Sequence, residues 1–434
     1  MWESKLIVPS RRKFLKTSTV LAAGAAVSGS LGIARSAHAA GDDEIKIALI
    51  GCGGRGTGAA EQALATQGKV KIIALADAFR DRLDGAYNHL SNVKKDRVDV
   101  PEERKFVGLD AYQKAIDSGV DLVLLATPPG FRPMHFEAAV KAGKHVFMEK
   151  PVATDPAGVR IVLAAAQESR KKGLAVGVGL QRRHQKEYQE TIKRIQDGAI
   201  GDIVAARVYW NGQTPWVNPR KPGQTEMEYQ LRNWYYFVWI CGDHIVEQHI
   251  HNLDVINWVK GKYPVKASGM GGCQVRKGKD YGETFDHHCV EFEYDDGTRM
   301  FSQCRHIPGC WSSVSEHVHG TRGRSNCANF IQGESEFRYR GENPNPYQLE
   351  HDDLFASIRS GSPINEAENG AYSTMTAILG RMCTYSGQEL SWEQCLASTI
   401  TYMPETFAWD APMPSMPDDQ GMYKIPLPGI TKVV

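Results

Sequence analysis

Short runs of consecutive apolar residues alternate with longer amphipathic stretches along the chain after residue 44. Runs of this length without polar interruption are typical of strands buried on both faces of a parallel sheet. We expect such strands at residues 45–50, 71–76, 122–126, 145–148 and 174–180. The amphipathic stretches predict helices at residues 57–66, 80–94, 134–142 and 155–172. Strands that alternate with helices predict an α/β fold with a doubly wound parallel sheet joined by right-handed crossovers.

The pattern changes after Gly201, where apolar and polar residues begin to alternate. The stretches 203–209 and 288–294 have this period of two, which is typical of strands in an open, mostly antiparallel sheet. Asp295–Thr298 carries the Asp-Gly signal of a hairpin. The other elements expected here are helices at 347–359 and 371–385 and a proline-rich surface arm after Tyr402. This half of the chain therefore predicts an α+β domain.

The first residues have the pattern of an export signal. Arg11 and Arg12 form a twin-arginine motif, a weakly apolar run covers residues 17–33, and Ala37–Ala39 is an A-x-A cleavage site. An uncleaved membrane anchor is the alternative, but the run is short and contains several glycines and serines. We predict a twin-arginine signal peptide at 1–39, Tat export to the periplasm or the medium, and no stable membrane insertion.

Composition excludes several classes of partner. The 51 basic and 50 acidic residues give a net charge of +1, which provides no field for nucleic acid or for an anionic membrane. The 42% hydrophobic content suits two globular domains with real cores. The nine cysteines lack C-x-x-C or zinc-like spacing, so we expect no disulfide framework. The histidines lack a clean ligand pattern, so we expect no metal site.

A glycine loop, Gly51–Gly56, stands between the first predicted strand and the first predicted helix. In this context the motif indicates a dinucleotide-binding Rossmann domain. Gly51 allows the tight turn, Gly53 lets the backbone approach the pyrophosphate, and Gly56 lets the helix pack against the strand. Arg55 could add a charge-assisted contact to the phosphates. We predict this Rossmann domain at 40–165 and a C-terminal substrate-binding and oligomerisation domain at 166–434.

Asp77 follows the second predicted strand, at the distance at which an acidic residue accepts hydrogen bonds from the adenosine ribose. Its charge would repel a 2′-phosphate, which favours NAD over NADP. Arg80 and Arg82 stand close by in the sequence, so NADP remains possible.

Three further motifs carry a family resemblance: Thr127-Pro128-Pro129, Glu149-Lys150-Pro151 and His251-Asn252-Leu253-Asp254. With the glycine loop they make the chain resemble the glucose–fructose oxidoreductase/inositol dehydrogenase (Gfo/Idh/MocA) family from Ile45 nearly to the C-terminus. The resemblance implies that Lys150 lies beside the nicotinamide, often before a cis proline, and shares proton transfer with a histidine. It also implies that Thr127, Pro128 and Glu149 lie on the cofactor side. Dimers and tetramers occur in the family, so we expect a homo-oligomer.

Residues 242–254 are expected to form one helix on which Glu247 and His251 stand four positions apart and share a face. His244 and Asp254 lie near the same stripe, whereas His249 points away and is interpreted as structural. An acid and an imidazole in this register can form a proton relay. The family pattern usually has Asp at the position of Glu247, so the relay geometry differs here. An ordinary polar helix face is the alternative.

The chemistry fits these residues. Oxidation of a secondary alcohol moves hydride to the nicotinamide while a base removes the hydroxyl proton, and a positioned base is worth about 10²–10⁴ in rate. Oxidised nicotinamide is cationic, whereas the reduced ring is neutral, so Lys150 can hold the proton after hydride transfer. We predict Lys150, His251 and Glu247 as catalytic residues.

Aromatic residues cluster just before the His251 segment, with Trp210 and Trp216 upstream. Flat aromatic faces can cover the C–H faces of a sugar, although core packing explains many such residues equally well. We predict a small carbohydrate substrate contacted by Arg183, Trp234, Tyr236 and His251.

Three functions are compatible with these features. The first is an exported NAD(P)-dependent oxidoreductase of a sugar, glycoside or polyol with tightly retained cofactor. The second is an NAD-dependent glycoside hydrolase or lyase that works by transient oxidation and elimination, although His319-Gly320 lacks the glycine-rich setting expected for that branch. The third is a non-catalytic sugar-binding protein. The simultaneous presence of Lys150, Glu247 and His251 favours an enzyme.

Overall fold

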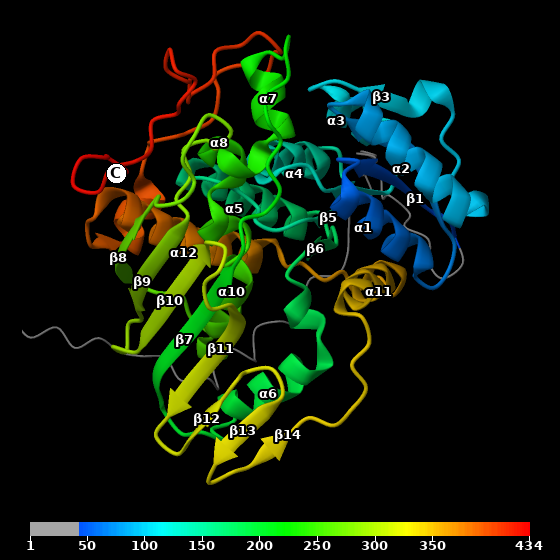
Figure 1. Ribbon diagram of the computed structural model, residues 1–434. Coiled ribbons are helices and arrows are strands. Elements are labelled where there is room, and N and C mark those ends of the chain that lie inside the picture. The colour runs from blue at the N-terminus through cyan, green and yellow to red at the C-terminus, as the bar shows by residue number, and fades with distance from the viewer. Residues whose placement is uncertain (1–42) are drawn as a thin grey trace, which may run out of the picture. The chain divides into compact units, whose positions relative to one another are not determined.

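The computed structural model describes residues 43–434. The predicted signal peptide lies outside the described residues. The described chain contains two sheets. In Figure 1 the strands of the first sheet run from blue to teal, and most strands of the second sheet are green or yellow. In the described part of the chain, no helix combines the length and the apolar character needed to cross a membrane.

The first sheet has six parallel strands in the order β3-β2-β1-β4-β5-β6. They are β1 (Ile45–Ile50), β2 (Val70–Asp77), β3 (Lys105–Val107), β4 (Leu122–Leu125), β5 (His145–Met148) and β6 (Val176–Val178). The predicted doubly wound sheet is confirmed. β3 was not predicted, because it is three residues long and none of them is buried. β6 pairs with β5, so the sheet continues beyond residue 165, where the first domain was predicted to end.

Alternate residues of β1 pack into two cores on opposite faces of this sheet, as the period of a strand requires. Ala48 and Ile50 belong to the core that includes residues of α4 and α5, whereas Ile47 and Leu49 belong to the core that includes α1 and α2. The helices that connect the strands are α1 (Gly54–Ala65), α2 (Arg80–Val93), α3 (Ala111–Ile116), α4 (Arg132–Lys141) and α5 (Pro156–Lys171).

The second sheet has nine strands in the order β14-β13-β12-β11-β7-β10-β9-β8-β15, and only β7 and β10 pair in parallel. Its strands are β7 (Ile203–Gly212), β8 (Lys266–Gly272), β9 (His287–Glu293), β10 (Arg299–His306), β11 (Ser313–Gly320), β12 (Gly323–Ser325), β13 (Phe330–Gly333), β14 (Phe337–Arg338) and β15 (Leu390–Ser391). The predicted mostly antiparallel sheet is confirmed. The predicted hairpin joins β9 to β10, with Gly297 at φ +81°.

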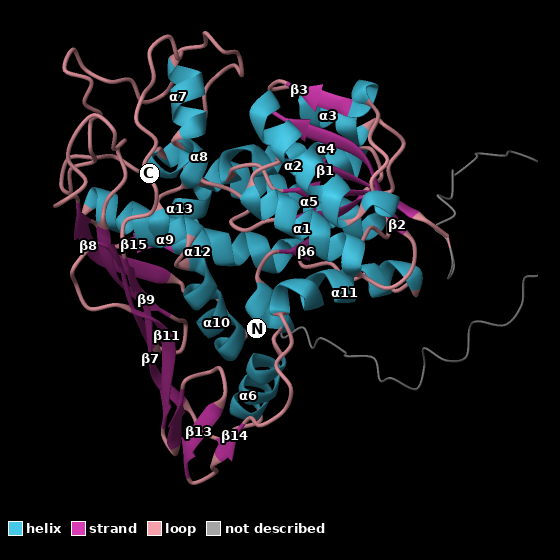
Figure 2. Cartoon of the chain, turned by 45° about the vertical axis from the view of Figure 1, so that its right-hand side comes forward, coloured by secondary structure: helices cyan, strands magenta, loops and turns pink. Residues whose placement is uncertain are grey.

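Helices cover one face of the second sheet, as Figure 2 shows for α10 and α12. The helices of this half are α6 (Lys186–Gln196), α7 (Glu226–Arg232), α8 (Val238–Cys241), α9 (His244–Glu247), α10 (Ile250–Lys260), α11 (Pro346–Arg359), α12 (Ala367–Ser386) and α13 (Trp392–Ala397). Residues after Ala397 contain no helix or strand, in agreement with the expected arm.

The prediction of one helix over residues 242–254 is wrong. α9 ends at Glu247 and α10 begins at Ile250. In a continuous helix the N–H of His251 would donate to the carbonyl of Glu247, but it donates to Gln248 instead. The carbonyl of Glu247 is thereby left for a side chain from the other sheet.

Candidate active site

A cleft of about 770 Å³ lies along the carboxyl ends of the parallel strands and reaches the second domain. In open α/β sheets this edge is where ligands bind. Of the predicted site residues, all but two line the cleft: Gly51, Gly53, Arg55, Gly56, Asp77, Thr127, Pro128, Glu149, Lys150, Trp234, Glu247 and His251. The cleft therefore brings the predicted cofactor loop and the predicted catalytic residues together.

The glycine loop has the geometry of a phosphate cradle. Gly51 has φ +97°, and a Cβ there would lie 2.5 Å from the backbone of Ala126 and Thr127. A Cβ on Gly56 would lie 1.9 Å from the carbonyl oxygen of Gly51. By contrast, a Cβ on Gly53 would meet nothing within 4 Å, so this backbone is open to the cleft. α1 begins at Gly54 without a side-chain cap, which leaves its N–H groups available for an anion.

Asp77 ends β2 at the mouth of the cleft. Its Oδ2 accepts from the N–H of Cys52 at 2.7 Å, and its Oδ1 accepts from the N–H of Phe79 at 2.9 Å. These bonds orient the carboxylate and leave further lone pairs for ribose hydroxyls. Burial raises the pKa of Asp77 from its ordinary value. Arg80 forms ion pairs with Asp84 and Glu102, whereas Arg82 lines the cleft.

Arg55 is held at the edge of the cleft by Glu149, with 2.5 Å between Nε and Oε1. Its guanidinium also lies over the ring of Tyr347, 4.9 Å from the centroid, and 3.6 Å from Glu350. Tyr347 and Glu350 belong to α11, which lies beside α1 although far away in sequence (Figure 1). Burial, and then the charge of Glu149, raise the pKa of Glu350 well above its ordinary value. Sequence reasoning did not predict that α11 contributes to this site.

Lys150 reaches from the end of β5 to the residue where α9 ends. Its Nζ donates to the carbonyl oxygen of Glu247 at 2.7 Å and to the carboxylate oxygen Oε1 at 3.2 Å. The other oxygen, Oε2, accepts from the hydroxyl of Tyr235 at 2.9 Å. The Lys150–Pro151 peptide is cis, as the resemblance implied.

His251 lies in the same cleft and stacks on Trp210, with 5.8 Å between ring centroids. Its Nδ1 is buried and has no hydrogen-bond partner among the described residues. Burial, and then the charges of Lys150 and Arg182, lower the pKa of His251 well below its ordinary value. The imidazole is therefore neutral at physiological pH, and its ring nitrogens are available for hydrogen bonds.

Two predicted substrate residues do not line the cleft. Arg183 forms a bidentate ion pair with Asp254, with Nε–Oδ2 and NH2–Oδ1 distances of 2.9 and 2.7 Å. A guanidinium bound in this way is a structural tie between η5 (Gln181–His184) and α10. Tyr236 is fully buried, and its hydroxyl donates to the carbonyl oxygens of Pro215 and Trp216. Both side chains stabilise segments next to the cleft through these contacts and do not line the cleft itself.

Several lining residues were not predicted as site residues: Arg132, Trp210, Trp216, Asn218, Gln248 and Tyr347. Arg132 is buried and donates to the carbonyl oxygen of Leu125 at 2.7 Å, and burial lowers its pKa to about 10. Neither Arg132 nor Gln248 belongs to a recognisable motif in the sequence. Their place in the cleft follows from the fold alone.

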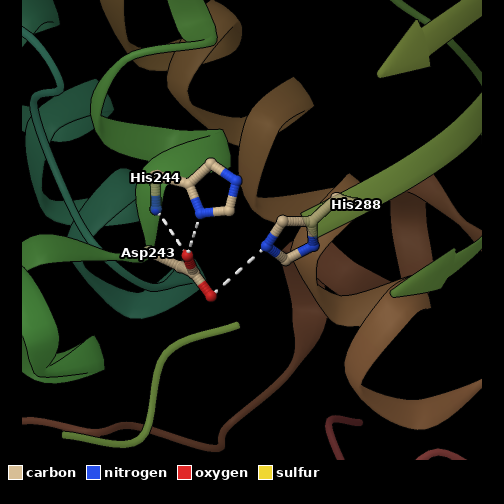
Figure 3. Close-up of side chains that lie close together, drawn as sticks. All are labelled: Asp243, His244 and His288. Carbon is tan, nitrogen blue, oxygen red and sulfur yellow. Dashed lines mark hydrogen bonds and ion pairs between the residues drawn. The ribbon is translucent and has the colours of Figure 1, made fainter. Parts of the chain in front are cut away.

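Asp243, His244 and His288 form a buried group whose ligand atoms lie within 4.8 Å of one another (Figure 3). The carboxylate of Asp243 accepts from the N–H and Nδ1 of His244, the N–H of Phe285 and the hydroxyl of Tyr385. Although burial opposes it, the two imidazoles hold the pKa of Asp243 well below its usual range. Because both oxygens already accept hydrogen bonds from the protein, we interpret the group as a brace for the start of α9 rather than as a metal centre.

The parallel sheet, the glycine cradle and the adjoining amine and imidazole define a dinucleotide-binding oxidoreductase. Residues 45–179 match the family described as "Oxidoreductase family, NAD-binding Rossmann fold", and residues 188–325 match the "GFO/IDH/MocA C-terminal domain". Together these segments span more than half of the chain, which belongs to the Gfo/Idh/MocA family.

Three similar proteins share between 21% and 26% of their residues with this chain over the matched segments. Inositol 2-dehydrogenase of Rhizobium meliloti is 24% identical over 283 residues, which are 64% of this chain and 74% of the relative. The 2,7-anhydro-N-acetylneuraminate hydratase of Escherichia coli is 26% identical over 202 residues, 46% of this chain and 49% of the relative. The scyllo-inositol dehydrogenase structure from Lactobacillus casei, with NAD(H) and scyllo-inositol, matches with a TM-score of 0.61 at 21% identity, covering 81% of this chain and 100% of that one.

Proposed function

We propose that the protein oxidises a secondary alcohol of a sugar, glycoside or polyol, with NAD as the hydride acceptor. The observation that carries this proposal is the position of Lys150, Glu247 and His251 in one cleft with the glycine cradle. The family and the dehydrogenase relative support it. The bound nicotinamide would accept the hydride, and the residues of this chain would bind, orient and move protons.

In this proposal the Lys150 amine accepts the proton of the substrate hydroxyl as hydride leaves and becomes the ammonium. Glu247 holds the ammonium in place through its carbonyl and carboxylate oxygens. His251, which is neutral because its pKa is lowered, would accept a hydrogen bond from the substrate hydroxyl in the same cleft. A positioned base of this kind contributes about 10²–10⁴ in rate.

The side of the cleft formed by the second domain suits a carbohydrate. Trp210, Trp216 and Trp234 line it, and Trp216 is 44% exposed. Such rings can cover the C–H face of a sugar while polar groups bind its hydroxyls. The Lys150 ammonium beside them already has Glu247 as counter-charge, which favours an uncharged substrate.

The test is to purify the protein, identify the nucleotide released on denaturation, and screen neutral aldoses and inositols for reduction of bound nicotinamide. Lys150→Ala should keep nucleotide binding and lose turnover by ~10² or more. Lys141→Ala, an exposed lysine paired with Glu137 on α4, is the matched control and should be as active as wild type. Equal turnover of Lys150→Ala and wild type would exclude the proposed role.

Export with the cofactor already bound is part of the proposal and rests on the twin-arginine sequence. A retained cofactor cannot exchange with a soluble pool, so a second substrate or partner must reoxidise it, and ping-pong kinetics between two carbohydrates are expected. The homo-oligomer, as dimer or tetramer, belongs to the same proposal. Nucleotide content of the exported protein tests the retention.

A redox-neutral reaction through transient oxidation is the second candidate, and the hydratase relative favours it. His319-Gly320, the pair relevant to the glycosidase branch, ends β11, and neither residue lines the cleft. Release of product from a glycoside without net change in nicotinamide absorbance would support this candidate. Stoichiometric reduction of bound nicotinamide by a sugar would support the first.

A further inference from the structure

Gln248 lies between α9 and α10, directly after Glu247, and lines the cleft. Its side-chain oxygen Oε1 is 2.8 Å from Nε2 of His306, the last residue of β10. Within residues 43–434 no hydrogen bond involves the Gln248 amide nitrogen. This amide thus has one end fixed by the protein and one end without a partner.

The direction of this hydrogen bond follows from the group on the other side of His306. NH2 of Arg276 is 2.6 Å from Nδ1 of His306. A guanidinium has donors only, so Nδ1 must accept and the ring proton must be on Nε2. The Nε2–H therefore donates to Gln248, and the atom facing His306 must be the amide oxygen. The NH2 group of Gln248 is consequently directed away from His306.

Arg276 is held in the position from which it donates to His306. It is 2% exposed, and its NH1 donates to the carbonyl oxygen of Phe285 at 3.1 Å. Its guanidinium also lies over the ring of Tyr236, 5.1 Å from the centroid. Burial lowers the pKa of His306 far below its ordinary value, so the ring carries only one proton. Nδ1 therefore remains the acceptor from Arg276, and Nε2–H remains the donor to Gln248.

We propose that Gln248 presents its amide NH2 to the cleft as a hydrogen-bond donor that binds one oxygen of the substrate. His306 and Arg276 are positioning residues that prevent the amide from turning over. The ligand is an uncharged polyhydroxylated molecule with an acceptor oxygen, a hydroxyl or an acyl carbonyl, at this position. This inference rests on the proposed function and deepens it.

The expected effect is selectivity for one substrate oxygen. A half-buried donor left without an acceptor is unfavourable, so an analogue that lacks the matching oxygen should bind about 10- to 100-fold more weakly. Binding is measured by calorimetry on the nucleotide-loaded protein, first with neutral aldoses and inositols and then with the monodeoxy analogues of the best ligand. Exactly one analogue class should show the large penalty.

Gln248→Met tests the donor, because methionine has similar length and no N–H. It should weaken the parent ligand about 10- to 100-fold and remove the penalty for the matching deoxy analogue. Gln113→Met is the matched control, since Gln113 is an exposed glutamine bound to Asp117 on α3 and should leave affinity unchanged. Equal penalties in Gln248→Met and wild type would overturn the proposal.

Two variants at His306 separate positioning from folding. His306→Gln can accept from Arg276 through its oxygen and donate to Gln248 through its nitrogen, so it should retain the selectivity. His306→Leu cannot, and should lose most of it while nucleotide content remains as in wild type. If both variants discriminate the analogues equally well, His306 does not position Gln248. If His306→Leu fails to fold, the comparison of Gln248→Met with His306→Gln still decides the proposal.

The outcomes distinguish this inference from the proposed function. Selective sugar binding that depends on Gln248 without reduction of nicotinamide would remove the oxidoreductase role and keep the recognition role. Normal reduction of nicotinamide together with analogue selectivity that is unchanged in Gln248→Met would remove the recognition role alone. Absence of sugar binding by the nucleotide-loaded wild type would remove both.

Discussion

Lys150 and Glu247 are 97 positions apart, and the Nζ of the lysine is 2.7 Å from the main-chain carbonyl oxygen of the glutamate. This contact exists because the helix breaks after Glu247 and leaves that carbonyl without a helical partner. The carboxylate of the same residue adds a second contact at 3.2 Å. One residue of the second domain thus holds the amine that the parallel sheet supplies.

Substitution of Glu247 should separate the two contacts. Glu247→Gln removes the charge but keeps the carbonyl, so we expect nucleotide binding to persist and turnover to fall by ~10- to 100-fold. Glu247→Asp keeps the charge on a shorter side chain and should give an intermediate rate, because it cannot reach both Lys150 and Tyr235. Steady-state kinetics and bound nucleotide are the measurements. Glu137→Gln, an exposed position on α4, is the control.

Tyr235 provides a milder test of the same carboxylate. Tyr235→Phe removes the O–H that donates to Glu247 at 2.9 Å and keeps the ring in its buried position. We expect a fall in turnover of ~10-fold or less, with melting temperature close to that of wild type. A larger loss than for Glu247→Gln would mean that Tyr235 contacts the reacting atoms itself.

The sequence allowed prediction of the parallel sheet because uninterrupted apolar runs are a local signal. The roles of the glycine loop and of Asp77 could be predicted for the same reason. The loop directly follows β1 and Asp77 is the last residue of β2, so each position can be read from one local strand. The break between α9 and α10 could not, because the segment has helical periodicity and no glycine or proline at the break. The carbonyl that the break leaves free is bound by Lys150, 97 positions away, which no local pattern indicates.

Long-range pairing also explains why two predicted substrate residues do not line the cleft. Arg183 follows a strand end as a ligand-binding arginine would, but Asp254, far away in sequence, binds its guanidinium. Tyr236 and Tyr235 are neighbours in one aromatic run, yet only Tyr235 contacts Glu247. Which of two adjacent tyrosines faces a site is set by local backbone direction, and a 3-10 turn at 234–236 has no simple periodic signal.

The glycine loop yields a matched pair of variants. Gly56→Ala should disrupt the fold, because its Cβ would lie 1.9 Å from a backbone oxygen that has little room to move. Gly53→Ala should fold normally, since a Cβ there meets nothing within 4 Å, but should weaken NAD binding by ~10-fold or more through the methyl group in the cleft. Thermal melting and NAD titration would measure both. An intact Gly56→Ala protein with wild-type stability would contradict this account of the loop.

Asp77 is expected to determine the preference between NAD and NADP. Asp77→Asn removes the charge that repels a 2′-phosphate, and Arg82 also lines this cleft. The ratio of the NADP to NAD dissociation constants should fall by ~10-fold or more, as expected for the loss of one charge at short range. Asp117→Asn on the exposed surface is the control for a general charge effect. An unchanged ratio would mean that the ribose is bound by other groups.

Buried imidazoles make stability depend on pH. Burial lowers the pKa of His135, His249 and His351 to about 3 and that of His244 to about 4. In the unfolded chain these groups titrate near ~6.5, so below that pH the unfolded state binds more protons than the folded state. The free energy of unfolding should therefore decrease as the pH falls from ~6.5 towards the folded pKa values, by up to ~1.4 kcal/mol per pH unit for each group.

His249→Gln tests this dependence at one residue, because glutamine can keep a hydrogen bond to Ser302, which His249 contacts at 2.8 Å. Denaturant unfolding between pH 7.5 and 5 should show a slope smaller than wild type by up to ~1.4 kcal/mol per pH unit, with His89→Gln on the surface as control.

His184 affects the pH dependence of stability in the opposite direction: although burial opposes it, Asp353 and Glu366 raise its pKa to about 10. Its contribution is complete below ~6.5 and is lost as the pH rises towards that value. Stability should therefore decline on both sides of neutrality, and an acid slope identical in His249→Gln and wild type would show that folding does not lower the pKa of His249.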